Sequence, residues 1–383
     1  MKTKHILFLT SWYPNRNSPF AGDFIQRHAR AASALNKITV LHASRNDTQE
    51  KHYEITQNQD IINEIIIYYK GSFFQPFNYF KRLIALYKGL KLVENYDLVH
   101  LNVTYPAGIF ALFLKFFKNK KYVITEHWTG FEKSKFKNIN PVERFLIKMI
   151  LKYSEILMPV STDLANNIRQ NAGSVKEINI VPNIVDTVNF QPGATHEAGS
   201  NEKIRFLHLS SLNERQKNIT GMLNVAKRLA AENYPFEFHI GGNGDLKAVK
   251  EFITNNRLQA SLFPVSPLPY EKVGELMNKC DCFVLFSNYE TQSCVRLESF
   301  SCGLPFIGTN IGGVNEFFPD DFGILVEKGN EDELFDAMRS VIEGKKFAAK
   351  EEMHQYAADN FSVESISKKF NDIYEKVLAD EKN

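Results

Sequence analysis

The segment Ser287–Gly303 (SNYETQSCVRLESFSCG) combines two carboxylates with a turn that leads into a predicted helix. Glu290 and Glu298 are separated by seven residues. The loop after the first glutamate contains Thr291, Gln292, Ser293 and Cys294. Backbone N–H groups at the start of a helix lack partners within the helix and bind anions or sugar oxygens. With one carboxylate in the loop and the other in the helix, this segment suits a ligand with neighbouring hydroxyls, such as a ribose or a hexose.

Short β-rich runs alternate with amphipathic helical stretches in the first half of the chain. The predicted strands are His5–Thr10, Ile38–Ala43, Asp97–Asn102, Tyr122–Glu126 and Glu155–Val160. The predicted helices include Phe24–Leu35, Tyr79–Val93, Ala107–Phe117 and Val142–Tyr153. Alternation of this kind predicts a parallel sheet with helices on both faces.

A polar stretch rich in Pro, Gly and Ser, residues 191–202 (QPGATHEAGSNE), interrupts the alternation and is interpreted as a linker. The alternation then restarts, with predicted strands at Ile204–Leu209, Phe236–Gly241, Leu262–Val265, Cys282–Phe286 and Pro305–Gly308. The closing helices are predicted at Glu331–Glu343, Lys346–Asp359 and Val363–Ala379.

This pattern predicts two doubly wound α/β domains in tandem. The N-terminal domain is expected over residues 1–190 and the C-terminal domain over residues 203–360. Residues 361–383 are expected to form a C-terminal helix that packs back on the N-terminal domain. Because ligands of such sheets bind at the carboxyl ends of the strands, we expect the two domains to share a binding cleft.

The glutamate segment resembles the retaining glycosyltransferases of family 4, which have the GT-B fold of two facing Rossmann-like domains. The shared features are a glutamate pair, a Cys-Gly-x-Pro turn and a Gly-Gly-x-x-Glu loop. They correspond to Glu290, Glu298, Cys302, Gly303, Pro305, Gly312, Gly313 and Glu316. The resemblance continues into Gly323–Val326 (GILV) and also includes Val181–Phe190 (VPNIVDTVNF), where Ile184 replaces the usual glycine. It covers nearly the whole chain and implies the GT-B fold.

The resemblance implies roles for the two glutamates. In the family the second glutamate typically holds the ribose and the first holds hydroxyls of the donor sugar, which assigns Glu298 and Glu290 respectively. The loop after the strand at Leu262–Val265 is similarly expected to read the nucleotide base with backbone groups, beginning at Val265. We therefore expect a nucleotide-diphosphate sugar as the donor.

A second segment, Leu209–Asn218 (LSSLNERQKN), resembles the diphosphate-binding segment of the family. Lys217 corresponds to its lysine, but the family arginine corresponds to Ser211, and Asn218 occupies the usual glycine position. One expected cation is therefore missing. Two arginines remain open as its replacement, Arg215 and Arg296.

Two residues of the first half also match the family. Gly22 resembles the glycine of a loop in which a backbone amide approaches phosphate or the donor sugar, and a glycine leaves room because it has no Cβ. His127, in the segment TEHWTGF, matches the acceptor-domain histidine that points at the donor sugar. The resemblance thus assigns catalytic roles to His127, Glu290 and Lys217.

The sequence does not predict a metal or a cofactor. It lacks Asp-x-Asp, the usual metal-binding signature of metal-dependent sugar transferases, so a diphosphate would be neutralised by Lys217, another cation and helix N-termini. It also lacks GxxxxGK[ST], and the segment GGNGD at Gly241–Asp245 lacks the third glycine of a dinucleotide fingerprint. The four cysteines include no CxxC pair and are interpreted as buried, reduced thiols.

Charge is distributed unevenly between the two halves. Residues 1–190 hold 25 Lys and Arg against 15 Asp and Glu, whereas residues 191–383 hold 21 against 29. The basic half suggests an anionic acceptor or an anionic membrane surface, and nucleic acid is not an expected partner. No apolar run is long enough to cross a bilayer, so we expect a cytoplasmic protein, peripheral on the inner face of the membrane if it meets one.

We therefore expect a retaining, metal-independent glycosyltransferase that moves a hexosyl or N-acetylhexosaminyl group to a glycan or lipid-linked acceptor. Two alternatives stay open. A sugar-nucleotide epimerase can share this architecture, and the missing arginine is also compatible with a non-catalytic glycan-binding relative. Formation of an epimer without an acceptor would favour the first alternative, and failure to bind any nucleotide sugar would favour the second.

Overall fold

The computed structural model describes residues 3–173, 175–193 and 203–379. These residues form two compact units. The first unit contains the chain up to Ile184 together with the part from Val363 onward, and the second contains Val185–Ser362. Of the predicted linker, residues 194–202 lie outside the described residues.

A seven-stranded sheet forms the centre of the first unit, in the order β3-β4-β2-β1-β5-β6-β7. Its strands are β1 (His5–Thr10), β2 (Lys37–Arg45), β3 (Tyr53–Gln59), β4 (Asn63–Tyr69), β5 (Leu98–Asn102), β6 (Tyr122–Glu126) and β7 (Leu157–Pro159). All neighbours pair in parallel except β3 and β4, which are antiparallel. Every residue of β1, β5 and β6 is buried, as expected for parallel strands covered on both faces.

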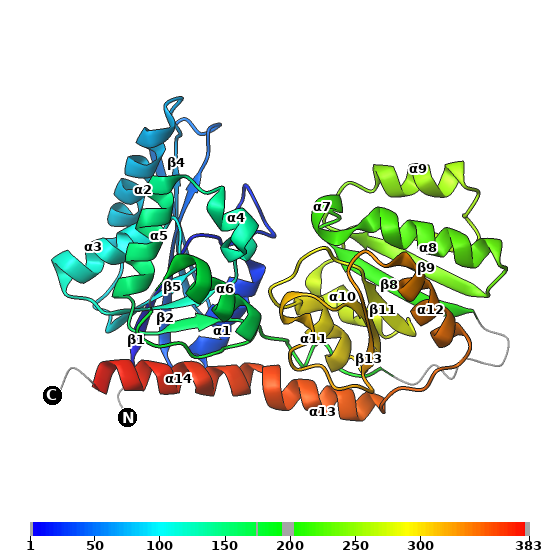
Figure 1. The fold of residues 1–383 in the computed structure, drawn as a ribbon. Coiled ribbons are helices and arrows are strands. Elements are labelled where there is room, and N and C mark those ends of the chain that lie inside the picture. Colours follow the sequence, from blue (N-terminus) through cyan, green and yellow to red (C-terminus); the bar gives the residue numbers. More distant parts are fainter. Residues whose placement is uncertain (1–2, 174, 194–202, 380–383) are drawn as a thin grey trace. The chain divides into compact units, whose positions relative to one another are not determined.

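Helices cover both faces of this sheet. One face packs against α2 (Gln75–Leu90), α3 (Gly108–Lys118), α5 (Pro141–Tyr153) and α6 (Thr162–Ala172), whose apolar side chains share one buried cluster with the strands. The other face packs against α1 (Asp23–Ser33) and α14 (Val363–Ala379), which lie side by side (Figure 1). A 3-10 turn at Thr129–Phe131 and the short helix α4 (Lys133–Lys137) follow β6.

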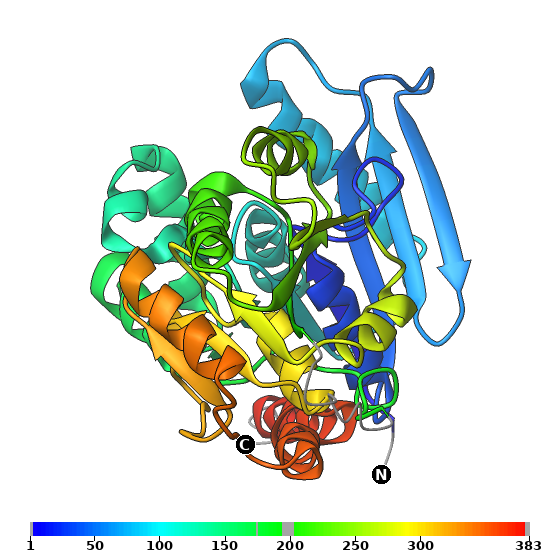
Figure 2. The same cartoon turned by 90° about the vertical axis from the view of Figure 1, so that its right-hand side faces the viewer.

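The β3–β4 hairpin at the edge of the sheet is absent from the predicted elements. Figure 2 shows it in light blue, extending along the edge beside β2. Residues Ile55 to Gln59 of β3 are all exposed, and most of them are polar. An outermost strand faces solvent along one side and has no buried face here, so the apolar alternation that identifies a half-buried strand is missing.

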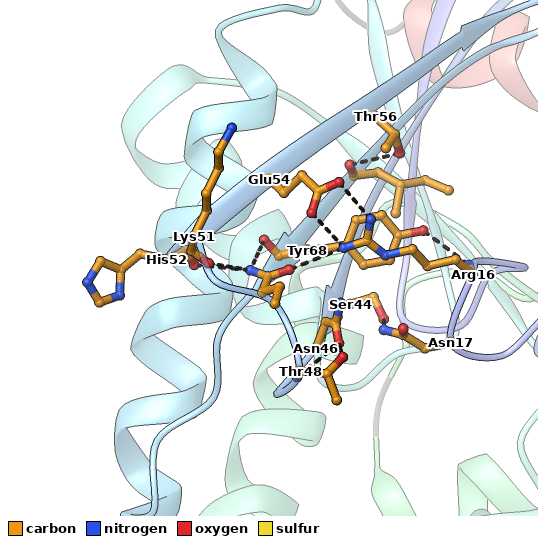
Figure 3. A network of polar contacts seen from close by, with 12 residues as sticks. Arg16, Asn17, Ser44, Asn46, Thr48, Lys51, His52, Glu54, Thr56 and Tyr68 are labelled. Atoms are coloured by element: carbon orange, nitrogen blue, oxygen red, sulfur yellow. Dashed lines mark hydrogen bonds and ion pairs between the residues drawn. The ribbon is translucent and has the colours of Figure 1, made fainter.

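A polar network ties the loop that follows β1 to this hairpin (Figure 3). The Arg16 guanidinium donates to both carboxylate oxygens of Glu54, at 2.6 and 2.7 Å, and lies 3.9 Å from the centre of the Tyr68 ring. Asn17 Nδ2 donates to the Arg45 carbonyl at 3.0 Å. The network fixes the loop that leads to Gly22.

A six-stranded parallel sheet forms the centre of the second unit, in the order β10-β9-β8-β11-β12-β13. Its strands are β8 (Ile204–Ser210), β9 (Phe236–Gly242), β10 (Leu262–Val265), β11 (Cys282–Leu285), β12 (Phe306–Thr309) and β13 (Gly323–Val326). One face packs against α8 (Ile219–Ala231), α9 (Lys247–Asn255) and α12 (Glu331–Ile342), and the other against α10 (Tyr270–Met277), α11 (Cys294–Ser301) and α13 (Lys350–Phe361). Both units are therefore doubly wound Rossmann-like domains, which confirms the predicted fold class.

Helix α13 begins at Lys350, four residues later than the predicted start at Lys346. The intervening backbone makes other contacts, since the Ala348 N–H donates to the Asp321 carbonyl at 2.9 Å. Helical periodicity of the side chains could not reveal this competing bond.

The four cysteines are free thiols, of which Cys294 is partly exposed and the other three are buried. Burial raises the pKa of Cys280 and Cys302 to about 12, so both remain protonated at neutral pH. Among the described helices, none is both long enough and apolar enough to cross a membrane.

Candidate functional site

The segments that carry the predicted donor-binding residues of the second unit lie at the carboxyl edge of its sheet. Because all six strands are parallel, the segments after β8, β10, β11 and β12 emerge at the same edge. Helix α7 (Glu214–Lys217) follows β8, and the glutamate segment follows β11. The Asn288 N–H donates to the Gln216 carbonyl at 2.7 Å, so the two segments are joined directly.

Lys217 and Glu290 form an ion pair at this edge. Lys217 Nζ lies 2.5 Å from Glu290 Oε1, and Ser287 Oγ donates to the same oxygen at 2.8 Å. The side chains of Lys217 and Glu290 are only 13% and 8% exposed. A cation at the end of α7 and a carboxylate in the loop after β11, both nearly removed from water, form an arrangement suited to a phosphate and to sugar hydroxyls.

The loop between the glutamates leads into α11 through a capped turn. Ser293 is the N-cap, and its hydroxyl accepts the Arg296 N–H at 3.4 Å. The Thr291 carbonyl accepts the Gly313 N–H at 3.1 Å, so the loop is joined to the 3-10 turn at Gly312–Val314. Gln292 and Ser293 are buried, whereas Thr291 and Cys294 are partly exposed.

Two further predicted donor-binding residues of this unit are Glu298 and Val265. Glu298 lies on α11, with its side chain almost wholly buried at 4% exposure. Val265 is the last residue of β10 and pairs with Gly241 of β9. A Cβ on Gly241 would lie 2.1 Å from the Val265 carbonyl oxygen, so glycine is required for the two strands to meet there.

In the first unit, Gly22 lies at the start of α1, in a left-handed conformation with φ of 70°. A Cβ at this position would lie 2.9 Å from the backbone carbonyl carbon of Trp12. Both the backbone angle and the close approach therefore require glycine. At the start of α1, the Ile25 and Gln26 N–H groups donate to the Gly22 carbonyl, at 2.9 and 3.3 Å.

His127 follows β6 and is buried among aromatic side chains. Its ring centre lies 4.5 Å from that of Phe24 and 5.1 Å from that of His28. Burial, followed by repulsion from His28 and His100, holds the pKa of His127 well below its ordinary value. The imidazole is therefore neutral at physiological pH, and its Nε2 atom has no hydrogen-bond partner among the described residues.

Glu126 is a fully buried carboxylate that the sequence analysis did not select. Its Oε1 accepts the N–H groups of His127 and Trp128, each at 2.8 Å. Its Oε2 accepts the Thr104 N–H at 2.8 Å and the Thr104 hydroxyl at 2.5 Å. Burial raises the pKa of Glu126 despite these four bonds. The signal in the sequence was a glutamate at the end of the apolar run YVITE.

Two sequence profiles together match most of the chain. The profile described as Glycosyltransferase Family 4 matches residues 21–189, and that described as Glycosyl transferases group 1 matches residues 195–361. This chain belongs to the group 1 glycosyltransferases of family 4. Like known members, this glycosyltransferase has the GT-B fold: it superposes on sucrose-phosphate synthase from Thermosynechococcus elongatus with a TM-score of 0.82 at 16% identity, covering 98% of this chain and 99% of that one.

Relatives of this glycosyltransferase include one synthase and two transferases. N-acetyl-alpha-D-glucosaminyl L-malate synthase from Bacillus anthracis is 25% identical over 76% of this chain and 77% of its own length. An N-acetylgalactosaminyltransferase that acts on a diphospho-undecaprenol, from Campylobacter jejuni, is 28% identical over 62% of this chain and 64% of its own length. An Escherichia coli alpha-1,3-galactosyltransferase named for UDP-Gal and a diphosphoundecaprenol is 26% identical over 69% of this chain and 71% of its own length.

The structure explains one departure of this glycosyltransferase from its family. Asn218, at the usual glycine position, has φ of 49° and ψ of 53°, a left-handed conformation that asparagine tolerates better than most residues. Its side chain accepts the Gly221 N–H at 3.3 Å and caps α8. Asparagine therefore replaces the glycine without loss of the turn.

The two arginines considered as the missing cation have different environments. Arg296 is wholly buried, and its Nη1 donates to the carbonyls of Val314 and Glu316, the second at 2.7 Å. Arg215 is exposed on α7, and its carbonyl accepts Asn288 Nδ2 at 3.2 Å. In this conformation Arg296 Nη1 supports a turn from inside the domain, and its Nε and Nη2 atoms have no hydrogen-bond partner among the described residues. Arg215 is exposed on the same short helix as Lys217.

Proposed function

We propose that this glycosyltransferase transfers a hexosyl or N-acetylhexosaminyl group from a nucleoside-diphosphate sugar to a lipid-linked or glycan acceptor, with retention and without an essential metal. The observation that carries the proposal is the Lys217–Glu290 pair. It places an ammonium group and a carboxylate together at the carboxyl edge of a Rossmann-like sheet, where nucleotides bind. The names of the three relatives support a hexosyl or N-acetylhexosaminyl donor and, for two of them, a lipid-linked acceptor.

The second unit would hold the donor. Glu298 would accept hydrogen bonds from the ribose hydroxyls, and backbone groups after Val265 would contact the base. Lys217, Arg215 and the N–H groups at the start of α11 would bind the diphosphate by charge-assisted hydrogen bonds. Glu290 would accept hydrogen bonds from the transferred sugar, and a diphosphate that draws Lys217 away would free its oxygen for this role. Arg296 would position the turn at Gly312–Val314.

The first unit would supply the acceptor side. The unpartnered Nε2 of His127 would bond a substrate hydroxyl, and Gly22 would allow a backbone amide to approach the substrate closely. Because its pKa is well below the ordinary value, His127 would act as a neutral hydrogen-bonding group and would not carry a positive charge.

In the reaction, the bond between the anomeric carbon and the diphosphate oxygen breaks while the acceptor oxygen forms a bond to the same face of that carbon. The acceptor proton passes to an oxygen of the departing diphosphate. Lys217, Arg215 and the helix N–H groups would stabilise the charge that develops on the leaving group. Retention follows because attack and departure occur on one face.

The test is an incubation of the full chain with UDP-, GDP- and ADP-sugars, with and without candidate acceptors, analysed for free nucleoside diphosphate, new glycoside and epimerised donor. The proposal expects release of nucleoside diphosphate that depends on an acceptor and persists in EDTA. Epimerised donor without an acceptor would indicate the epimerase alternative. Absence of binding to every donor would indicate a non-catalytic protein, and activity lost in EDTA and restored by Mg²⁺ would contradict metal independence.

A further inference from the structure

The outer side of helices α2, α3 and α5 in the first unit exposes an unusual amount of apolar surface. Among the described residues, eighteen large apolar side chains are exposed, and eleven of them lie between residues 73 and 145. They are Phe73, Phe74, Phe77, Phe80, Ile84, Tyr87, Leu92, Phe116, Phe117, Val142 and Phe145. A contiguous set of this kind on a protein surface indicates an interaction site. We call it the aromatic face.

Helix α2 is apolar on two sides. Ala85 and Leu86 are buried in the cluster that covers the sheet. Phe77, Phe80 and Ile84 recur at helical spacing on the other side and are 56%, 64% and 47% exposed. A helix that is apolar on its covered side needs no further apolar stripe for folding, so the second stripe indicates a second contact.

The three helices form one continuous layer. The ring of Tyr87 on α2 meets the edge of Phe113 on α3, with centres 6.4 Å apart. Phe116 on α3 meets Tyr153 of α5 in the same way at 5.0 Å. The exposed side chains of these helices therefore belong to one surface of the first unit.

The same part of the chain carries the positive charge of the first half. Residues 70–153 contain 15 Lys and Arg against 5 Asp and Glu, while the rest of residues 1–190 contains 10 of each. One of the five acids, Glu126, is fully buried. Four exposed lysines of α2, α3 and α5 form no ion pair with any described residue, namely Lys88, Lys118, Lys148 and Lys152.

We propose that the aromatic face and its lysines dock the protein onto an anionic lipid bilayer. Exposed phenyl rings can enter the boundary between headgroups and acyl chains, while the surrounding ammonium groups contact lipid phosphates. The large excess of positive charge favours an anionic bilayer over a second copy of this chain, because two such faces would repel each other.

The location of the face fits a lipid-linked acceptor, and in this respect the inference rests on the proposed function. Phe73 and Phe74 follow β4 and precede α2, so they lie at the carboxyl edge of the first sheet. His127, after β6, and Gly22, after β1, lie at the same edge. A bilayer held by this face would present lipid headgroups to the edge that carries His127.

Vesicle flotation of the full chain tests the proposal. Wild-type protein is expected to float at low salt with vesicles of phosphatidylcholine and phosphatidylglycerol, less with phosphatidylcholine alone, and less as salt is added. The triple substitution Phe73→Ser, Phe77→Ser, Phe80→Ser should lower partitioning by at least about tenfold, since burial of even one such ring is worth roughly that factor. Lys118→Gln, Lys148→Gln, Lys152→Gln should cause a loss of similar order.

A matched control is the pair Ile61→Ser and Val188→Ser, which removes two apolar side chains that are 69% and 77% exposed elsewhere. Its flotation should equal that of the wild type. A wild-type protein that ignores anionic vesicles at low salt overturns the proposal, and so does a phenylalanine variant that floats like the wild type. A wild-type dimer that the phenylalanine substitutions convert to monomer, seen by light scattering, would assign the face to a second copy.

Nucleotide binding separates this proposal from the proposed function. Calorimetry should give the same affinity for a nucleoside diphosphate in the wild type and in both triple variants, because the donor residues lie in the second unit. Lost flotation with intact nucleotide binding supports the docking surface. Normal flotation without binding of any nucleoside diphosphate would contradict the proposed function and leave the docking surface supported.

Discussion

The ammonium group of Lys217 and the carboxylate of Glu290 meet at 2.5 Å although the residues are 73 positions apart in the sequence. One follows β8 and the other follows the neighbouring strand β11. Both side chains are nearly buried, so each compensates the charge of the other in the absence of substrate. Removing one partner leaves an uncompensated charge in poorly hydrated surroundings.

We therefore expect Lys217→Met and Glu290→Gln to be strongly coupled. Each single substitution should lower the free energy of unfolding of the second unit, and the double variant should lose less than the sum, with a coupling energy of roughly 1 to 3 kcal/mol. Urea unfolding of the four proteins measures this coupling. Additive losses would show that the pair contributes nothing in the free protein. The exposed pair Arg228 and Asp332 is a control and should show less than about 1 kcal/mol.

Glu126 is expected to act as a positioning residue for His127. In Glu126→Gln, one pair of N–H or O–H donors would face an amide NH₂ group instead of a carboxylate oxygen, so the loop that holds His127 should shift. We expect kcat to fall by roughly tenfold to a hundredfold, the equivalent of about 1 to 3 kcal/mol. Affinity for the nucleoside diphosphate should not change. Steady-state kinetics and calorimetry measure the two effects.

The control for Glu126 is Glu132→Gln, which removes a carboxylate of the same segment that pairs with Lys135. It should leave kcat within about twofold, as expected for an ion pair that is still partly exposed to solvent. An unchanged kcat in Glu126→Gln, or an equal loss of nucleotide affinity, would contradict a role through His127.

Arg215 and Arg296 are expected to respond differently to substitution. Arg215→Met should weaken binding of the nucleoside diphosphate by about tenfold or more, without affecting the nucleoside, because it removes one charge-assisted contact to phosphate. Arg296→Met should lower the stability of the second unit, because the carbonyls of Val314 and Glu316 lose a buried donor. Calorimetry with both ligands, together with thermal unfolding, distinguishes the two. Selective loss of diphosphate affinity in Arg296→Met alone would reverse the assignment.

The buried histidines predict that the first unit is the more sensitive to acid. Burial lowers the pKa of His28 to about 4 and of His42 to about 3, and holds those of His100 and His127 well below the ordinary value. Because the unfolded chain binds these protons near pH 6.5 and the folded chain does not, stability falls as the pH falls below 6.5. Each group contributes about 1.4 kcal/mol per pH unit until its folded pKa is reached.

The pKa of Glu126 is raised, so this carboxyl group makes the folded state more stable as the pH falls. It is a single group, whereas four histidines have the opposite effect. Among the described residues of the second unit, burial lowers the pKa of a single histidine, His208, to about 4. Urea unfolding followed by hydrogen exchange at pH 7 and pH 5 should therefore show a larger loss in the first unit. His42→Gln should reduce the pH dependence of that unit. Equal losses in both units would contradict this explanation.

Some features were predictable from the sequence because they depend on local patterns. The continuous apolar strands β1, β5 and β6 identified the parallel sheet, and the spacing of the glutamates identified α11 and its loop. The contacts of buried polar groups were not predictable, because they join distant segments. The arginine in the glutamate motif could equally have faced a ligand, and only the tertiary structure shows it against the Val314 carbonyl.

The edge hairpin and Glu126 escaped prediction for related reasons. Strand β3 has no buried face and therefore no alternation of apolar residues. Glu126 is satisfied by Thr104, 22 residues earlier in the sequence, through a pairing that only the packing of β5 beside β6 creates. Sequence patterns record burial on a regular element, but they do not record which distant donors satisfy a buried acceptor.

The central claim is that the second unit binds a nucleoside-diphosphate sugar, with Glu298 contacting the ribose and Glu290 contacting the transferred sugar. Calorimetric titration of UDP, GDP and ADP into the wild type, Glu298→Gln and Glu290→Gln tests it most directly. Wild-type protein should bind at least one of the three. Glu298→Gln should weaken that binding by roughly tenfold or more, through loss of a hydrogen bond between a charged group and the ribose. Glu290→Gln should bind at least as tightly as the wild type, because Lys217 no longer has a carboxylate partner. Equal weakening in both variants, or no binding by the wild type, would contradict the claim.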